Sequence, residues 1–240
     1  MSTSAADFAQ SCKAHGIELS QEAVERFAAY HARLLEANRK FNLTAVRDPD
    51  LVWSRHFLDS LYLVPALPSD ATTLIDVGSG GGFPGIPTAI ARPSLAITLL
   101  EATKKKADFL ADVIDELGLD AVNVVNERAE TLGRAVDHRE TYDVATARAV
   151  ADLAELAELT LPFVRVGGTL LALKGTAAPD EIAGAEAAIE RMGGAPASVT
   201  SATGGELETS GAVLVHVDKI ASTPAEYPRR PGMPGKRPIR

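Results

Sequence analysis

A short stretch of the chain has the composition of a nucleotide-binding turn. Residues 73–87, TLIDVGSGGGFPGIP, join an apolar run to a turn with five glycines, and Gly80, Gly82 and Gly85 have the spacing G-x-G-x-x-G. Without a Cβ, such a turn lets a ligand approach the main-chain N–H groups that precede a helix. The spacing alone leaves three interpretations open: a nicotinamide or flavin dinucleotide, S-adenosylmethionine, or a tight connection without a ligand.

An acidic residue beside this turn helps to separate the ligands. Asp76 lies at the end of the apolar run, where a carboxylate is costly unless it faces a cationic or hydrogen-bonding group. Dinucleotide-binding strands are usually apolar at this position. The cationic amino-acid end of S-adenosylmethionine suits an acid that acts directly or through the loop.

Two further positions suit a nucleoside. Glu101 ends the next apolar run, 23 residues beyond Gly78, where a carboxylate can accept hydrogen bonds from both ribose hydroxyls. This supports either ligand equally. After the third run, Ala129 and Glu130 could flank an adenine ring, although Glu130 could equally be a helix-capping acid.

The pattern of the chain predicts the scaffold for these residues. From residue 72 onward, short apolar runs alternate with helical periodicity, which indicates a Rossmann-like α/β fold: a mostly parallel seven-stranded sheet with helices on both faces. The expected strands are TLIDV, AITLLE, VNVVN, YDVATA, GGTLLALKG, APASVTS and AVLVHVDK. Residues 20–41 and 48–67 have helical spacing. We therefore expect a helical N-terminal extension at 1–70, a core at 71–220 and a basic tail at 221–240.

Composition restricts the class of protein. With 240 residues and 46% apolar content, the chain can bury a substantial core. It has no run of roughly 18 apolar residues and no signal-like N-terminus, so we expect a cytoplasmic protein without a membrane partner. The single cysteine, Cys12, excludes an internal disulfide framework and a thiolate cluster, and no metal site is expected. A net charge of −8 opposes wholesale wrapping of nucleic acid.

Six segments resemble one bacterial family. NLTAVRDP, RHFLDS, IDVGSGGGFPGIP, the Lys-rich stretch after LLEAT, TARAVADL and LALKG occur in the order and spacing of the GidB family, also called RsmG. The resemblance covers residues 42–175. It implies a class I S-adenosylmethionine-dependent methyltransferase that modifies guanine N7 in 16S ribosomal RNA. The implied partner is this RNA, the 30S subunit or an assembly intermediate.

The resemblance also implies particular cofactor contacts: Gly78, Phe83, Ala129, Glu130 and Arg148. We add Gly80 from the glycine turn and Glu101 from the ribose argument. Members of the family often have threonine or proline within the loop and leucine in place of Phe83. We expect this departure to change the shape of the loop and to leave its main-chain role intact.

The implied reaction requires little chemistry from the protein. Guanine N7 already presents a lone pair, so methyl transfer needs no general base, only an in-line arrangement at roughly 3–3.5 Å with water excluded. The chain agrees with this, because Cys12 is far in sequence from the sheet and is no candidate for a pyrimidine nucleophile. After the fourth strand, TARAVAD replaces the Asn/Asp-Pro-Pro-aromatic turn common in adenine-amine methylation.

Cations at the strand ends are candidates for positioning the substrate. Arg148 and Lys174 end the fourth and fifth strands, from which they could reach guanine O6 or phosphates. The structural alternatives are a salt bridge from Arg148 to Asp143 or Asp152, and a solvent-facing Lys174.

Two other basic segments remain open to interpretation. Residues 104–106 are three lysines in the expected first turn of a helix, where cations oppose the dipole. They contact phosphate or are simply solvated. The last twelve residues hold five cations and no acid among several prolines. We expect them to be extended and mobile when free, and either to contact RNA or to act as a solubilising terminus.

Two other classes of function stay under consideration. The G-x-G-x-x-G spacing and Glu101 also allow a nucleotide-dependent oxidoreductase. A noncatalytic RNA-binding or ribosome-assembly factor could retain a methyltransferase fold. We expect the protein to be a monomer in each case.

Overall fold

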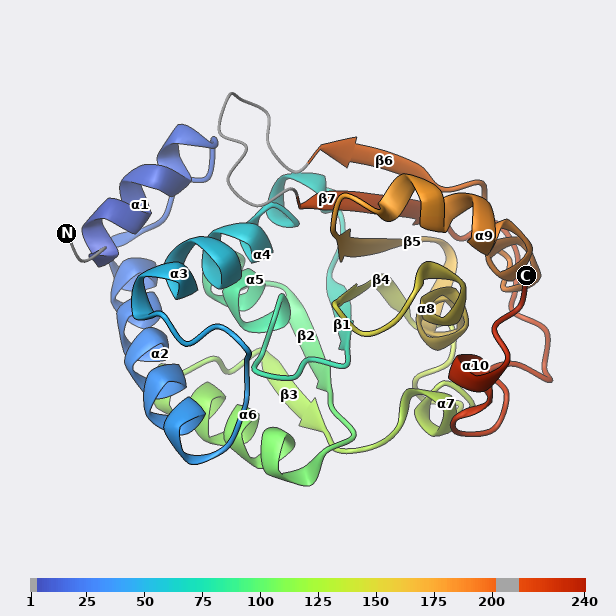
Figure 1. Ribbon diagram of the computed structural model, residues 1–240, viewed down its shortest axis with the longest axis horizontal. Coiled ribbons are helices and arrows are strands. Elements are labelled where there is room, and N and C mark those ends of the chain that lie inside the picture. The colour runs from blue at the N-terminus through green and yellow to red at the C-terminus, as the bar shows by residue number, and fades with distance from the viewer. Residues whose placement is uncertain (1–3, 202–211) are drawn as a thin grey trace.

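The computed structural model describes residues 4–201 and 212–240, which build one sheet covered on both faces (Figure 1). The strand order is β3-β2-β1-β4-β5-β7-β6. The strands are β1 (Thr73–Val77), β2 (Ala96–Leu100), β3 (Val122–Val125), β4 (Tyr142–Arg148), β5 (Val164–Lys174), β6 (Ser198–Ser201) and β7 (Val213–Asp218). β1 to β5 are parallel, whereas β7 is antiparallel to both neighbours. The predicted seven-stranded, mostly parallel sheet is confirmed.

The helices divide between the two faces, as Figure 1 shows. One group is α1 (Ala5–Ala14), α2 (Gln21–Lys40), α3 (Pro49–Val52), α4 (Asp59–Leu61), α5 (Gly85–Ala91) and α6 (Lys104–Leu117). The other is α7 (Ala129–Leu132), α8 (Leu153–Thr160), α9 (Ala178–Arg191) and α10 (Met233–Lys236). None of the helices in the described ranges has the length and apolarity needed to cross a bilayer.

Each face of the sheet has its own hydrophobic core. Leu74 and Leu99 pack with the N-terminal helices, whereas Ile75 and Leu100 pack with α8 and α9. Successive side chains of a strand point to opposite faces, so a strand buried on both sides is apolar at most positions. This explains why the strands read as continuous apolar runs.

The long helix α2 forms as its sequence predicts. Ser20 caps it, with its side chain accepting a hydrogen bond from the Ala23 N–H at 3.1 Å. Phe27, Tyr30 and Leu34 follow at three- and four-residue spacing and are fully buried. This buried face of α2 packs on aromatic rings of α1, the following helical turn and the glycine loop.

The second expected helix, over residues 48–67, is interrupted. Between α3 and α4 the chain makes a π-helical turn, Trp53–Leu58. The wider turn changes which side chains face inward, and Trp53, His56 and Phe57 are all buried. Trp53 stacks on His31 of α2 with ring centroids 4.5 Å apart, so it packs between helices.

The basic C-terminal segment, residues 221–240, is not the extended mobile tail that its composition predicts. Arg229 forms an ion pair with the buried Glu158 on α8, at 2.6 Å. The Gly232 N–H donates to the Glu130 carboxylate on α7 at 2.7 Å, and Arg240 pairs with Asp152 at 3.1 Å. The expectation was wrong because the acids that hold the segment lie about 70–100 residues away in sequence.

Candidate cofactor site and adjoining cavity

The glycine loop between β1 and α5 is left-handed at three positions. Gly78, Gly80 and Gly82 have φ values of +75°, +59° and +102°. Residues with a Cβ adopt these angles only with strain, so glycine is needed here for the path of the backbone itself.

Most glycines in this loop are needed because other parts of the protein come close to them, rather than to make room for a ligand. A Cβ added at Gly82 would lie 2.5 Å from the Tyr30 hydroxyl, and one at Gly85 would lie 2.8 Å from Asp76 Oδ2. At Gly80, in contrast, the nearest heavy atom would be 3.8 Å away. The close approach of α2 and α5 explains part of this glycine content.

The hydrogen bonds of the loop discriminate between ligands. The N–H of Gly78 donates to the Leu100 carbonyl at 2.8 Å, and the N–H of Gly80 donates to Glu101 Oε2 at 2.9 Å. The N–H groups of Ser79, Gly82 and Phe83 also have main-chain acceptors. A dinucleotide pyrophosphate binds through such N–H groups. With these donors engaged, the loop is better suited to the cationic amine of S-adenosylmethionine, for which Gly78 offers its carbonyl.

Asp76 acts through the loop rather than at its surface. It is fully buried, and Oδ2 accepts the Gly85 N–H at 3.0 Å. Burial raises the pKa of this carboxyl to about 7. Oδ1 is buried without a hydrogen-bond partner among the described residues. Asp76 therefore contacts the loop backbone, which fits the indirect role, and the role itself stays a prediction.

Glu101 lies where the ribose argument placed it, at the carboxyl end of β2. It is 6% exposed, and its two oxygens accept the N–H groups of Gly80, at 2.9 Å, and Thr103, at 2.7 Å. A carboxylate oxygen has a second lone pair, so Glu101 keeps the capacity to accept hydroxyl donors.

Ala129 and Glu130 begin the single turn of α7. Ala129 is partly buried, and the carboxylate of Glu130 faces the C-terminal segment, where it accepts the Gly232 N–H. Neither alternative for this side chain, flanking adenine or capping the helix, corresponds to that contact.

Arg148 joins the sheet to the N-terminal helices. Its Nη1 donates to the His56 carbonyl and Ser60 Oγ, both at 3.2 Å, and its Nη2 donates to the Arg55 carbonyl at 2.6 Å and His56 Nδ1 at 2.7 Å. The proposed salt bridges were wrong, because Asp143 pairs with Arg165 and Asp152 with Arg240.

His56 and Phe83 complete this junction. The His56 and Phe83 rings stack with centroids 4.5 Å apart, and the Arg148 guanidinium lies 5.7 Å from the centre of the Phe83 ring. Burial, aided by the Arg148 charge, lowers the pKa of His56 to about 4. The neutral ring accepts from Arg148 at Nδ1, so its Nε2 donates to Thr44 Oγ1 at 2.5 Å. His56 is therefore a buried packing residue, and sequence reasoning missed its hydrogen bond to Arg148.

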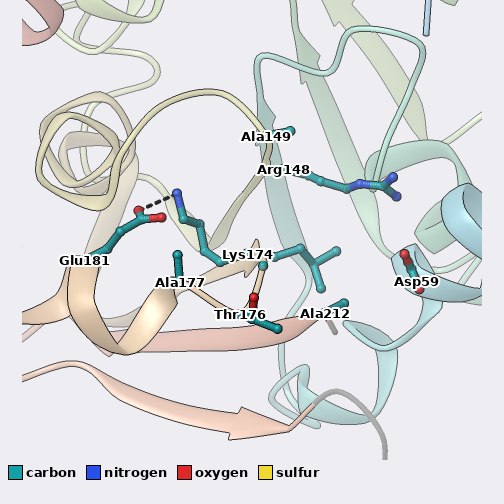
Figure 2. Close-up of a pocket in the computed structure, with 10 residues that line it drawn as sticks. Asp59, Arg148, Ala149, Lys174, Thr176, Ala177, Glu181 and Ala212 are labelled. Carbon is teal, nitrogen blue, oxygen red and sulfur yellow. Dashed lines mark ion pairs between the residues drawn. The ribbon is translucent and has the colours of Figure 1, made fainter. Parts of the chain in front are cut away.

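A cavity of about 380 Å³ adjoins this junction at the carboxyl ends of β4 and β5 (Figure 2). Its lining includes Asp59, Arg148 and Lys174. Lys174 pairs with Glu181 at 2.7 Å and donates to the Ala151 carbonyl at 2.7 Å, so the solvent-facing alternative was wrong. Figure 2 shows the Arg148 guanidinium directed away from Lys174, toward the side of Asp59. Across the described ranges, no cluster of three or more His, Cys, Asp or Glu residues could hold a metal ion.

The sheet order, the glycine loop and Glu101 can now be compared with known proteins. A family model described as "GidB: rRNA small subunit methyltransferase G" matches residues 23–209. The chain belongs to the GidB family. A GidB relative from Roseiflexus sp., "Ribosomal RNA small subunit methyltransferase G", is 48% identical and covers 95% of this chain and 96% of its own. One from Pelotomaculum thermopropionicum with the same name is 43% identical over the full length of both chains.

Solved structures support the fold of this GidB chain. A putative O-methyltransferase from Klebsiella pneumoniae superimposes with a TM-score of 0.56 at 18% identity, covering 80% of this chain and 90% of its own. The O-methyltransferase TomG from Streptomyces achromogenes, solved in complex with SAM, gives 0.55 at 17% identity with the same coverage. The class I methyltransferase fold is thus confirmed.

Proposed function

We propose that this GidB-family protein transfers the methyl group of S-adenosylmethionine to N7 of a guanine in 16S ribosomal RNA. The observation that carries the proposal is the loop at Gly78 and Gly80, which lies against Glu101 at the carboxyl edge of the sheet. The strong sequence similarity to small-subunit RNA methyltransferases supports the class of substrate.

The residues present fit the proposed cofactor. The open backbone at Gly80 leaves room, the Gly78 carbonyl can accept from the amino group, and Glu101 can accept from the ribose hydroxyls. Ala129 and Glu130 offer main chain to the adenine. Phe83 contributes through its backbone, because its ring is buried against His56. When bound, the cofactor supplies an electrophilic methyl group.

The chain needs only to hold and orient the base, because guanine N7 carries its own lone pair. The cavity at the carboxyl ends of β4 and β5 is the proposed place for the base. All the Nη contacts of Arg148 go to the π turn and α4, so we assign it the positioning of these elements beside Phe83. Lys174, held by Glu181, lines the opposite side and is proposed to orient the base.

The substrate is proposed to be 16S RNA, the 30S subunit or an assembly intermediate, met in the cytoplasm by a monomer. An oxidoreductase is disfavoured because the loop engages the N–H groups that a pyrophosphate needs. A noncatalytic assembly factor would bind the cofactor and transfer nothing.

The decisive experiment is transfer of a labelled methyl group to unmethylated 30S subunits and to naked 16S RNA, followed by nucleoside analysis. The proposal predicts a single product, 7-methylguanosine. Label in another nucleoside would contradict the assigned position. Cofactor binding without transfer to either RNA would favour the noncatalytic factor.

A further inference from the structure

Two helix ends meet beside the proposed cofactor site and carry exposed cations. The last turn of α2 contains Arg39 and Lys40, and the first turn of α6 contains three lysines. Lys40 and Lys105 line one hollow of about 270 Å³ between these helices. We define the α2–α6 basic surface as Arg39, Lys40, Lys104, Lys105 and Lys106.

The charge of this surface is only weakly neutralised by the protein. Among the ion pairs of residues 4–201 and 212–240, none involves Arg39, Lys105 or Lys106. Lys40 pairs with Glu36 and Lys104 with Asp108, each at 2.6 Å and in exposed positions. Exposed pairs of this kind are weak, so a phosphate can displace the carboxylates.

Elsewhere along the contact between α2 and α6, ion pairs neutralise the cationic charge. Arg33, further back on α2, pairs with Asp112 at 3.4 Å and with Glu116 at 3.0 Å on α6. The excess positive charge is therefore confined to the end of the α2–α6 contact that lies near the carboxyl edge of the sheet.

The first turn of α6 is locally unfavourable. It holds three lysines and no acid, and its N-cap, Thr103, makes no side-chain capping bond. Cations at this end oppose the helix dipole by a few tenths of a kcal/mol each. An anionic partner bound at this surface would offset the unfavourable interaction between these lysines and the helix dipole.

The surface also lies close to the cofactor loop along both elements. Thr103, directly before α6, donates its N–H to Glu101. On α2, the Leu34 side chain is close to Gly81 in the loop. Lys40 is six residues further along the helix, a rise of about 9 Å. Cations at this distance from the loop suit the phosphates of an RNA strand that reaches the cofactor.

We propose that the α2–α6 basic surface binds the phosphate backbone of the RNA strand next to the target guanosine. The inference rests on the proposed function, since it presumes an RNA substrate. The hollow between the helices has Phe41 and Phe109 in its lining, with ring centroids 6.3 Å apart. Its lining combines three cations and two aspartates with these aromatic rings, and cations beside aromatic rings suit a nucleotide.

The test compares two pairs of substitutions of equal charge. Lys105→Gln with Lys106→Gln removes two cations from the surface. The control, Lys13→Gln with Arg92→Gln, removes two cations from the end of α1 and the end of α5. Binding of 16S RNA is measured from 50 to 300 mM salt, together with cofactor affinity and methyl transfer.

The surface pair should weaken RNA binding about tenfold or more at 100 mM salt and reduce the slope of log K against log salt by roughly 2. Cofactor affinity should stay unchanged, and the loss in transfer should appear in the KM for RNA. The control pair should match wild type in slope. Equal salt slopes for wild type, the surface pair and the control pair would overturn the inference. Methyl transfer by wild type would in that case still support the proposed function. Absence of transfer by wild type would instead defeat the proposed function.

Discussion

The ion pair between Arg229 and Glu158 offers a sharp test of how the C-terminal segment is held. The Glu158 side chain is 1% exposed, and its two oxygens accept from Arg229 at Nε (2.9 and 3.0 Å) and at Nη2 (2.6 Å). Arg229→Met removes the charge and leaves the buried carboxylate without a cationic partner, with only the main-chain N–H of residue 229 still donating to it, at 2.7 Å. Breaking a buried pair in this way costs about 3–5 kcal/mol.

A loss of about 3 kcal/mol lowers the melting temperature by about 6–12 °C for a chain of this size. If residues 229–240 detach from the rest of the protein, water can solvate Glu158. The loss of stability therefore cannot exceed the free energy with which this segment binds to the rest of the fold. Hydrogen exchange should therefore lose protection first at the Gly232 amide. Because Glu130 accepts from that amide, α7 should loosen as well and cofactor affinity should fall.

The neighbouring Arg230 is exposed, so Arg230→Met is a matched control, expected within about 0.5 kcal/mol of wild type. Glu158→Leu combined with Arg229→Met should recover most of the lost stability, because an apolar pair can replace a buried ion pair. Denaturant unfolding and calorimetry measure both. Equal stability of the Arg229 and Arg230 variants would refute the reasoning.

Three more outcomes are expected. Gly82→Ala places its Cβ 2.6 Å from Ile86 and should destabilise the fold by about 1–3 kcal/mol, measured by thermal unfolding. Gly80→Ala should chiefly weaken cofactor binding, measured by calorimetry. A greater loss of stability at Gly80 and a greater loss of cofactor affinity at Gly82 would contradict the roles given to these two glycines. The pKa of His56 falls from 6.5 to about 4 on folding, so the unfolded chain binds more protons than the folded protein between these pH values. The free energy of unfolding should therefore rise by about 3 kcal/mol from pH 4 to pH 6.5. Urea titrations of His56→Gln should show a smaller dependence on pH. Burial raises the pKa of Cys12 to about 12, so a thiol reagent should label it only at the rate of unfolding, and fast labelling of the folded protein would show that the site opens.

The sequence determined what depends on neighbours along the chain. Strand runs, the Ser20 cap of α2 and the placement of Glu101 after β2 follow from local periodicity and from the βα repeat. The glycine turn was located by composition alone. These features were predictable because each lies within one or two consecutive elements.

The tertiary structure decided which groups meet across the chain. Gly85 is bare because Asp76 and Leu99 approach it, and Arg148 points to the π turn rather than to Asp143 or Asp152. The basic C-terminal segment packs on the fold because it binds Glu130 on α7 and Glu158 on α8. No local pattern encodes these pairings, since burial and partner depend on how distant segments pack, and a buried charge requires its partner wherever the chain supplies one.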